Sequence, residues 1–222
     1  MSLGELWPQP NLLAGYHLEN VNDFSGNGHT LTNENSVTFT MGRFANCANF
    51  GNPNTNKGLF CSTDLGISIP NSAWSTELWL NVLATPASGV YYCLLGWWSQ
   101  AGTKGLMKIY YYNAAGVPTL QVWTNNTAAR IAFPITFDIG KWYYIAVTQS
   151  SGGALALYVN GALVGTGTHS TEAATDARIS LGFTHGVQPS SVMLDEVVWW
   201  SRQLSAIEIR RWFAWSKGLL NG

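Results

Sequence analysis

Oxygen-bearing side chains gather in a glycine-containing segment near the amino end, residues 23–29 (DFSGNGH). Carboxylate, hydroxyl, amide and backbone carbonyl oxygens are the hard ligands that Ca²⁺ takes at about 2.3–2.6 Å. We therefore treat Asp23, Ser25 and Asn27 as candidate calcium ligands. The alternative is an Asx-turn, in which the Asp23 carboxylate accepts a hydrogen bond from the backbone two residues further on.

Aromatic side chains close to Gly- and Asn-containing turns suggest a second kind of chemistry, the binding of neutral sugars. Sugar C–H faces stack on Trp and Tyr rings, while a few polar groups take the hydroxyls. We predict that one concave face carries Trp97, Trp98, Tyr110, Tyr112, Trp123 and Asn125. The alternative is burial, because one ring of an adjacent pair must face the core. Exposed apolar patches equally mark protein contacts.

The acidic residues do not show the spacing that glycoside hydrolysis needs, which is two carboxylates about 5–10 Å apart. Glu77 stands alone in its predicted strand, and Asp195 and Glu196 are adjacent, so we expect them to point to opposite faces. The sequence also has no G-x-S-x-G motif for a serine nucleophile. We therefore predict no catalytic residues and no enzymatic activity, with a glucanase-type hydrolase as the weakest alternative.

One helix is expected near the carboxyl end. Ser205 and Glu208 form an S-x-x-E capping box, which predicts a helix start at Ser205. The apolar face of this helix is then given by i, i+3, i+4, i+7 spacing from Ile209 to Ser216.

The rest of the chain shows the two-residue alternation of strands. Residues 155–159 alternate, and Asn160-Gly161 is typical of a type I′ hairpin turn. Both faces of the segment 142–149 are partly apolar, which predicts a central strand covered by a second sheet on one side and by loops or a ligand on the other. Residues 1–222 are therefore expected to form a single all-β domain.

Several motifs occur in the order typical of one known family. They lie at residues 13–19, 23–29, 41–50, 74–81, 142–148, 155–161 and 194–209. Together they resemble the laminin-G-like, concanavalin-A-like jelly rolls of the lectin and glucanase superfamily. The resemblance implies a two-sheet antiparallel jelly-roll sandwich with one short carboxyl-terminal helix.

The same resemblance implies a structural calcium ion that clips the ends of the sandwich together. It adds Asp195, in the closing strand, as a second carboxylate ligand beside Asp23, with Glu19 as a weaker candidate. The alternative for the closing strand is a salt bridge from Asp195 or Glu196 to Arg202.

Composition limits the partners. Only 10% of the 222 residues are charged and the formal net charge is -1, so no basic stripe is available for nucleic acid. No apolar run approaches the ~20 residues of a membrane-spanning helix. Residues 1–8 lack the pattern of an export signal. We expect one of two locations. The protein is either extracellular, with its export signal already removed, or on the surface of a virion that is released by lysis.

The three cysteines leave at least one thiol unpaired. Cys47 and Cys61 would face each other if their strands were neighbouring antiparallel arms, which would permit a disulfide. The alternative is three small buried apolar side chains.

The sequence leaves two functions open. The first is a non-catalytic, lectin-like module that recognises glycans or a cell-surface protein and carries a structural calcium. The second is a structural or decoration protein of a virion head, tail or surface assembly, held by protein contacts and forming a homo-oligomer or larger assembly.

Overall fold

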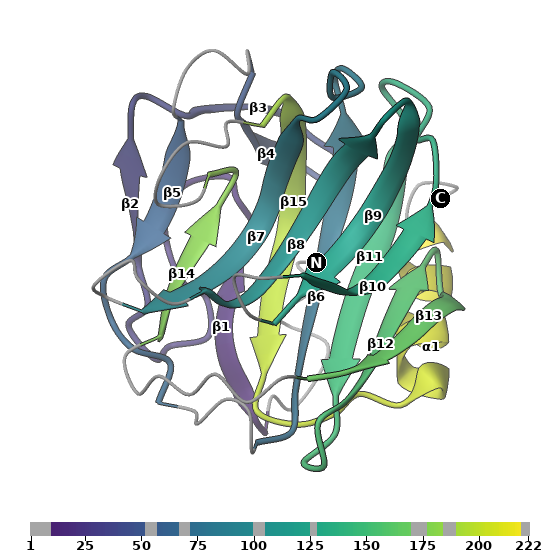
Figure 1. Cartoon of the computed structure of the whole chain (residues 1–222). Helices are drawn as coiled ribbons and strands as arrows, with labels where there is room; N and C mark the ends of the chain where they lie inside the picture. The colour runs from purple at the N-terminus through teal and green to yellow at the C-terminus, as the bar shows by residue number, and fades with distance from the viewer. Residues whose placement is uncertain are drawn as a thin grey trace.

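The computed structural model describes residues 10–51, 57–66, 72–99, 105–124, 128–169, 177–183 and 190–218. In these parts of the chain, two antiparallel sheets pack face to face and one helix follows the last strand (Figure 1). The predicted all-β sandwich with a carboxyl-terminal helix is confirmed. Among the described residues, no helix has the length and apolar character needed to cross a membrane.

The seven-stranded sheet lies towards the viewer in Figure 1. In order across the sheet, its strands are β10 (Ala129–Pro134), β9 (Val117–Trp123), β8 (Gly105–Ala114), β7 (Tyr91–Ser99), β14 (Ala177–Leu181), β5 (Gly58–Cys61) and β2 (Leu31–Glu34).

The eight-stranded sheet lies behind it. In order across the sheet, its strands are β13 (Ala162–Thr168), β12 (Ala154–Val159), β11 (Trp142–Gln149), β6 (Trp74–Val82), β15 (Val192–Trp200), β4 (Asn46–Asn49) and β3 (Thr38–Met41), and β1 (Leu12–Tyr16) pairs with β15 outside this order.

The main core fills the space between the two sheets, because alternate residues of each strand point inward. In β6, Trp74, Leu78 and Leu80 enter this core, whereas Glu77 and Trp79 point to the other side of the sheet. Every residue of β6 is buried all the same. The outer face of this sheet must therefore be covered by something else.

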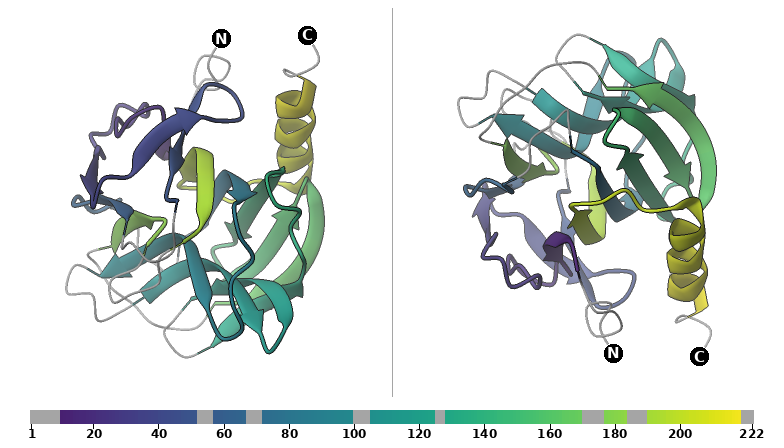
Figure 2. Two further views of the ribbon diagram at one scale, coloured as in Figure 1. Left: turned by 90° about the horizontal axis from the view of Figure 1, so that it is seen from above. Right: turned by 90° about the horizontal axis from the view of Figure 1, so that it is seen from below.

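The helix α1 (Ala206–Gly218) provides that cover. A second apolar cluster lies between α1 and the outer face of the eight-stranded sheet, and includes Tyr144, Trp200 and Ile209. Figure 2 shows the helix standing against that sheet, on the side away from the seven-stranded sheet. The central position predicted for residues 142–149 is confirmed, but the predicted cover of loops or a ligand is wrong, because helix α1 covers the outer face of β11.

The helix begins as its capping box predicts. The backbone N–H of Glu208 donates to the Ser205 hydroxyl at 3.3 Å, and the backbone N–H of Ser205 donates to the Glu208 carboxylate at 2.8 Å. Ile209 and Ser216 are buried on the side facing the sheet. The hairpin prediction is also confirmed, since Asn160 and Gly161 have φ values of 49° and 77° between β12 and β13.

The disulfide expectation is wrong. Cys47 lies in β4 of one sheet and Cys61 in β5 of the other, so their strands are not neighbours. Both thiols and that of Cys93 are free and buried. The alternative of three small buried side chains is confirmed, and burial raises the pKa of the Cys47 thiol to about 11.

Candidate functional site

The outer face of the seven-stranded sheet brings several predicted aromatic residues together. We call Tyr91, Trp98, Tyr110, Tyr112 and Trp123 the aromatic face. Tyr91 lies opposite Tyr112 in the register of β7 and β8, and opposite residues of antiparallel strands share a face. Their rings stack with centroids 3.8 Å apart and planes inclined by 10°. The Trp123 ring meets the Tyr110 ring edge to face at 5.9 Å.

Polar side chains are interleaved with these rings. Lys108 Nζ lies 4.4 Å from the Trp98 ring centroid and 5.8 Å from that of Trp123, a distance at which a cation is attracted to the ring face. The Trp123 indole donates to Gln121 Oε1 at 2.8 Å, and the Gln121 amide donates to the Thr119 hydroxyl at 2.9 Å. These bonds fix the orientation of Trp123 at the edge of the face.

Exposure divides the aromatic face into two parts. Trp98 and Tyr110 are only 9% and 4% exposed. Tyr91, Tyr112 and Trp123 are half-buried, so they present the ring surface that a ligand can reach. The sequence alone did not indicate Tyr91, because only the strand register shows that Tyr91 lies opposite Tyr112.

The structure does not place the other two predicted ligand-binding residues, Trp97 and Asn125, on this face. Trp97 is 0% exposed and packs edge to face on Trp74 in the main core, with ring centroids 5.4 Å apart. Its assignment as a ligand contact is wrong, because strand alternation turns Trp97 inward and Trp98 outward. Asn125 lies outside the described residues.

The Asp23 loop is held by its own hydrogen bonds. Asp23 Oδ1 accepts from the backbone N–H groups of Gly15 and Ser25, and Oδ2 accepts from the Ser25 hydroxyl and the His29 N–H, at 2.8–3.0 Å. Burial alone would raise the pKa of Asp23, but these bonds lower it overall. The Asn27 amide donates to the carbonyl of Leu12. This is the Asx-turn alternative.

The other predicted calcium ligand, Asp195, is 1% exposed. Its Oδ2 accepts from the backbone N–H of Arg43 at 2.8 Å, while its buried Oδ1 has no partner among the described residues. Burial, and then the neighbouring Glu196, raise the pKa of Asp195 to about 7. Glu19, the weaker candidate, is exposed.

The donor set fits calcium poorly. Both oxygens of Asp23 already accept hydrogen bonds, and within the described ranges no three His, Cys, Asp or Glu side chains come together as a metal group. Of the four carboxylate oxygens of Asp23 and Asp195, only Oδ1 of Asp195 has no hydrogen-bond donor among the described residues. Calcium binding stays a prediction.

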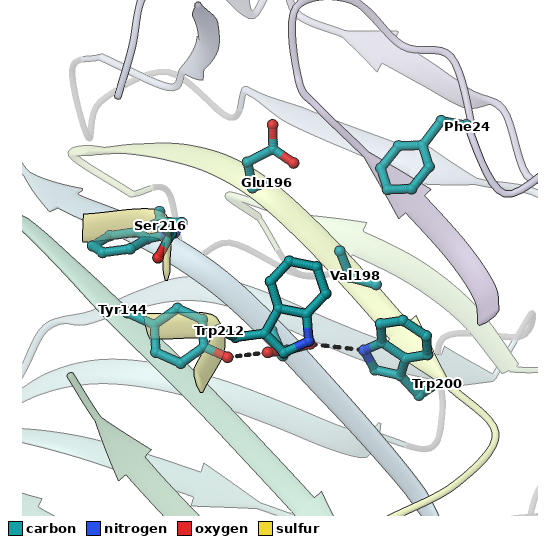
Figure 3. A pocket seen from close by; sticks show the side chains of 9 residues that line it. Phe24, Tyr144, Glu196, Val198, Trp200, Trp212 and Ser216 are labelled. Atoms are coloured by element: carbon teal, nitrogen blue, oxygen red, sulfur yellow. Dashed lines mark hydrogen bonds between the residues drawn. The ribbon is translucent and has the colours of Figure 1, made fainter. Parts of the chain in front are cut away.

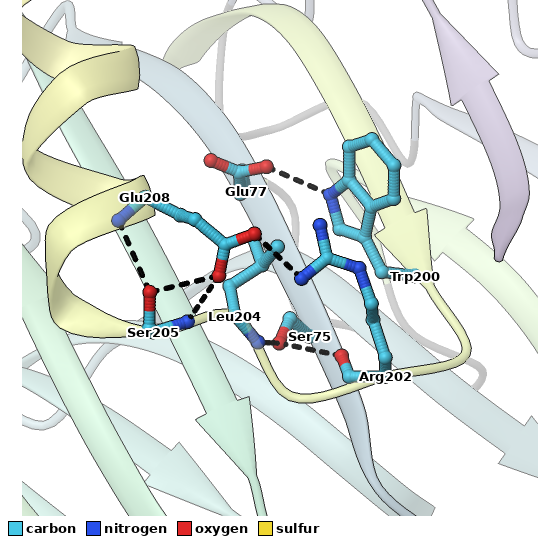
Figure 4. Close-up of polar contacts among 7 residues, drawn as sticks. All are labelled: Ser75, Glu77, Trp200, Arg202, Leu204, Ser205 and Glu208. Carbon is cyan, nitrogen blue, oxygen red and sulfur yellow. Dashed lines mark hydrogen bonds and ion pairs between the residues drawn. The ribbon is translucent and has the colours of Figure 1, made fainter. Parts of the chain in front are cut away.

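The proposed ion pair to Arg202 is wrong for both acids. Arg202 pairs with Glu208 of α1 at 2.7 Å, as Figure 4 shows. Glu196 instead contacts His17 Nδ1 at 2.9 Å. The His17 ring also stacks on Phe24, with centroids 4.2 Å apart. Burial would lower the pKa of His17, but the hydrogen bond and charge of Glu196 raise it overall.

A pocket lies between helix α1 and the outer face of the eight-stranded sheet (Figure 3). Its accessible volume is about 30 Å³, close to the space of a single water molecule. We call it the helix pocket, and its walls are Phe24, Glu77, Trp79, Tyr144, Glu196, Val198, Trp200, Trp212 and Ser216. Figure 3 shows the Trp212 indole lying across it, between Tyr144 and Trp200.

Glu77 lies at the base of the helix pocket. The Tyr144 hydroxyl donates to its Oε2, and the Trp200 indole donates to its Oε1 at 2.8 Å. Burial is the main influence on this carboxyl and raises its pKa, although both hydrogen bonds act in the opposite direction. The carboxyl is thus fully partnered and closely packed.

A β-bulge in β15 brings a second acid to the same pocket. Asp195 lies opposite Trp79 and Val198 lies opposite Glu77, so two residues of β15 occupy the space of one on β6. Glu196 within the bulge has a φ of 48°, which is uncommon outside glycine.

The bulge overturns one expectation from the sequence. Leu194 and Val197 both face the main core, so the two acids between them both lie on the helix side of the sheet. Asp195 and Glu196 therefore do not point to opposite faces. Glu77 is the one acidic residue of its strand, as predicted, and Glu196 from β15 lines the same pocket.

Residues 54–210 match a family model described as the concanavalin A-like lectin/glucanases superfamily. The chain belongs to this superfamily. The resemblance and the jelly-roll architecture predicted from the motifs are confirmed. No curated protein sequence matches the chain, so its membership of the superfamily rests on the family model.

Three solved structures show the same fold. The binding domain of Paraclostridial Mosquitocidal Protein 1 is similar with a TM-score of 0.71 and 19% identity, over 91% of this chain and 52% of that one. Domain 4 of AbnA, a GH43 extracellular arabinanase from Geobacillus stearothermophilus, is similar with a TM-score of 0.69 and 16% identity, over 91% of this chain and 98% of that one. The botulinum neurotoxin serotype D binding domain is similar with a TM-score of 0.69 and 14% identity, over 92% of this chain and 51% of that one. The chain thus spans about half the length of these toxin domains.

Proposed function

We propose that the chain is a non-catalytic carbohydrate-binding module, in which a sugar stacks on Tyr91, Tyr112 and Trp123. The observation that carries this proposal is the convergence of the aromatic face on one side of the seven-stranded sheet. The half-buried rings expose apolar surface on which a sugar can stack, and the bonds from Trp123 to Gln121 and from Gln121 to Thr119 hold the Trp123 ring in place.

The structural neighbours support a module of this kind. AbnA domain 4, which this chain nearly equals in length, was solved in complex with arabinotriose. The binding domain of botulinum neurotoxin DC was solved with SialylT and with rat synaptotagmin II. The last of these supports a protein receptor as the alternative partner. AbnA is an extracellular arabinanase, which supports an extracellular location for this chain.

A glycan array that includes arabino-oligosaccharides and sialylated glycans tests the proposal. We expect a reproducible hit, and titration calorimetry should show that Tyr112→Ala and Trp123→Ala each weaken it about ten-fold. Trp123→Phe, which keeps a ring, should retain most of the affinity. The matched control is Trp215→Ala, because Trp215 is a half-buried tryptophan on α1, away from the aromatic face.

Two outcomes would contradict the proposal. A blank array with folded protein would remove the support for glycan binding and favour a protein receptor. A hit that both ring variants retain at full affinity would place the glycan elsewhere. Circular dichroism of each variant separates lost binding from lost folding.

The remaining alternatives have their own measurements. Glu77 and Glu196 share a pocket, which is the arrangement that most resembles a hydrolase, but each already accepts hydrogen bonds from neighbouring side chains. We expect no release of reducing ends from glycan substrates. A virion or surface-assembly role predicts stable higher oligomers, which light scattering would detect.

A further inference from the structure

An open groove lies between helix α1 and the hairpin of β12 and β13, which Figure 1 shows at the same edge of the molecule. Its accessible volume is about 570 Å³, within the range of about 300–1,000 Å³ that is usual for small-molecule sites. We call it the hairpin groove, and its lining residues are Tyr158, Asn160, Gly161, Ala162, Leu163, Ala206, Arg210 and Phe213. None of them lines the helix pocket or belongs to the aromatic face.

Three side chains of the hairpin groove carry polar groups without a partner in the described part of the chain. Arg210 is exposed and forms no ion pair or hydrogen bond there. Tyr158 is only 7% exposed, and its hydroxyl has no partner either. Asn160 Oδ1 accepts from the backbone N–H of Tyr144 at 2.9 Å, which leaves its amide nitrogen free to donate. All three groups can therefore donate hydrogen bonds to a ligand.

The guanidinium of Arg210 lies close enough to the Tyr158 hydroxyl to influence it. Burial raises the pKa of Tyr158 above its ordinary value of 10.0, and the positive charge of Arg210 acts in the opposite direction. The hydroxyl thus keeps its proton at neutral pH and remains a donor. Arg210 and Tyr158 form a pair of donors from two different elements, α1 and β12.

An anion is the ligand that such a set of donors recognises. The lining residues include one cation and no carboxylate, so a single negative charge would be balanced. A carboxylate accepts two parallel N–H bonds from a guanidinium and has further lone pairs for the other two donors. A phosphate dianion would bring a second charge that no lining residue compensates.

The rest of the hairpin groove is apolar. Leu163 on β13 is 56% exposed, and Phe213 on α1 is half-buried. A Cβ at Gly161 would lie 3.2 Å from the Phe213 ring, so the hairpin turn packs directly against the helix. Sugar hydroxyls need acceptors as well as donors, whereas these side chains offer apolar surface. The part of the ligand beyond its carboxylate is therefore expected to be apolar.

We propose that the hairpin groove binds a small molecule in which a carboxylate is joined to an apolar group. The carboxylate accepts from Arg210, Tyr158 and Asn160, and the apolar group packs on Leu163 and Phe213. Both parts are needed, because an exposed ion pair alone contributes little. The site uses different residues from the proposed glycan site, so each can fail without the other.

3-Phenylpropionate is the probe, and 3-phenylpropanamide, an uncharged analogue of nearly equal shape, is the comparison. An NMR titration of the full chain should show saturable shifts of the Gly161 amide signal, with the carboxylate binding at least about ten-fold tighter than the amide. Equal affinities would overturn the carboxylate assignment, and no saturable shift with 3-phenylpropionate would overturn the proposal altogether.

Glucuronate tests the apolar part of the assignment, because it carries the same carboxylate on a hydroxylated ring. It should bind more weakly than 3-phenylpropionate in the same titration. Equal or tighter binding of glucuronate would overturn the apolar assignment and favour an acidic sugar as the ligand.

Matched variants locate the site. Arg210→Gln removes the charge and should weaken 3-phenylpropionate binding about ten-fold or more. Arg211→Gln removes the same charge from the next exposed position of α1, which does not line the groove, and should leave binding unchanged. Tyr158→Phe removes only a hydroxyl and should weaken binding about three-fold, with circular dichroism to confirm folding. If Arg210→Gln and Arg211→Gln bind equally well, the assignment of the site is wrong.

Discussion

The buried hydrogen bond between Tyr144 and Glu77 allows a sharp test of how the helix side of the sheet is stabilised. In Tyr144→Phe, the ring is kept and only the hydroxyl is lost, so Oε2 of Glu77 loses its donor in a fully buried position. Hydrogen bonds to charged or chargeable groups contribute about 1.5–3 kcal/mol, and an unpartnered buried acceptor adds the cost of its desolvation. We expect the free energy of unfolding to fall by about 2–3 kcal/mol.

The loss of stability in Tyr144→Phe should also depend on pH. Burial raises the pKa of Glu77 above its ordinary value of 4.5, so the folded chain holds this proton more tightly than the unfolded chain does. Stability from this group is therefore present at low pH and is lost as pH rises through the folded-state pKa. The Tyr144 hydroxyl favours the ionised carboxylate, so its removal should cost more above that pKa than below it.

Urea unfolding followed by tryptophan fluorescence at several pH values provides the measurement, and a thermal melt should show a fall of about 4–12 °C. The matched control is Tyr143→Phe, on the neighbouring position of β11. The Tyr143 hydroxyl accepts an exposed bond from the Asp138 N–H at 3.2 Å, and because this contact is exposed its loss should cost less than about 1 kcal/mol. Equal costs for the two variants would refute the reasoning.

Three further changes test other parts of the structure. Ser205→Ala removes the helix cap and should lower the free energy of unfolding by about 1 kcal/mol in urea; no change would mean that packing alone sets the helix start. Gly161→Ala places a Cβ 3.2 Å from Phe213 at a φ of 77°, and should cost about 1–2 kcal/mol in the same assay, whereas a neutral result would contradict the hairpin geometry. If calcium binds at Asp23 and Asp195, a chelator should lower the melting temperature of wild type but not of Asp195→Ala, and an unchanged wild-type melt would argue against the ion.

The fold was largely predictable because its signals are local. The alternation in β11 and β12, the Asn160-Gly161 turn and the capping box at Ser205 each act within a few residues. These signals predicted an all-β domain with one helix, and the resemblance of the ordered motifs to a known family implied the jelly roll. What local signals could not give was the partner of each strand, and the disulfide expectation failed for that reason, since Cys47 and Cys61 lie in different sheets.

The sites depended on non-local geometry and were predicted less well. Adjacent Trp97 and Trp98 are equivalent in the sequence, and only the strand orientation decides which one enters the core. Tyr91 joins the aromatic face through its register with Tyr112. The helix pocket gave no sequence signal, because a bulge and a helix contact bring Glu196 and Trp212 to Glu77.

The bulge in β15 also determines how this strand can change in length. A one-residue insertion or deletion in a regular strand turns every later side chain to the other face. Removal of Glu196 alone would restore regular alternation and leave Val197, Trp199 and Trp200 on the faces they already occupy. The extra residue thus adds a carboxylate to the helix pocket while the core sequence on either side stays as it was. Evolution can therefore gain, lose or replace this one group without redesigning the sandwich.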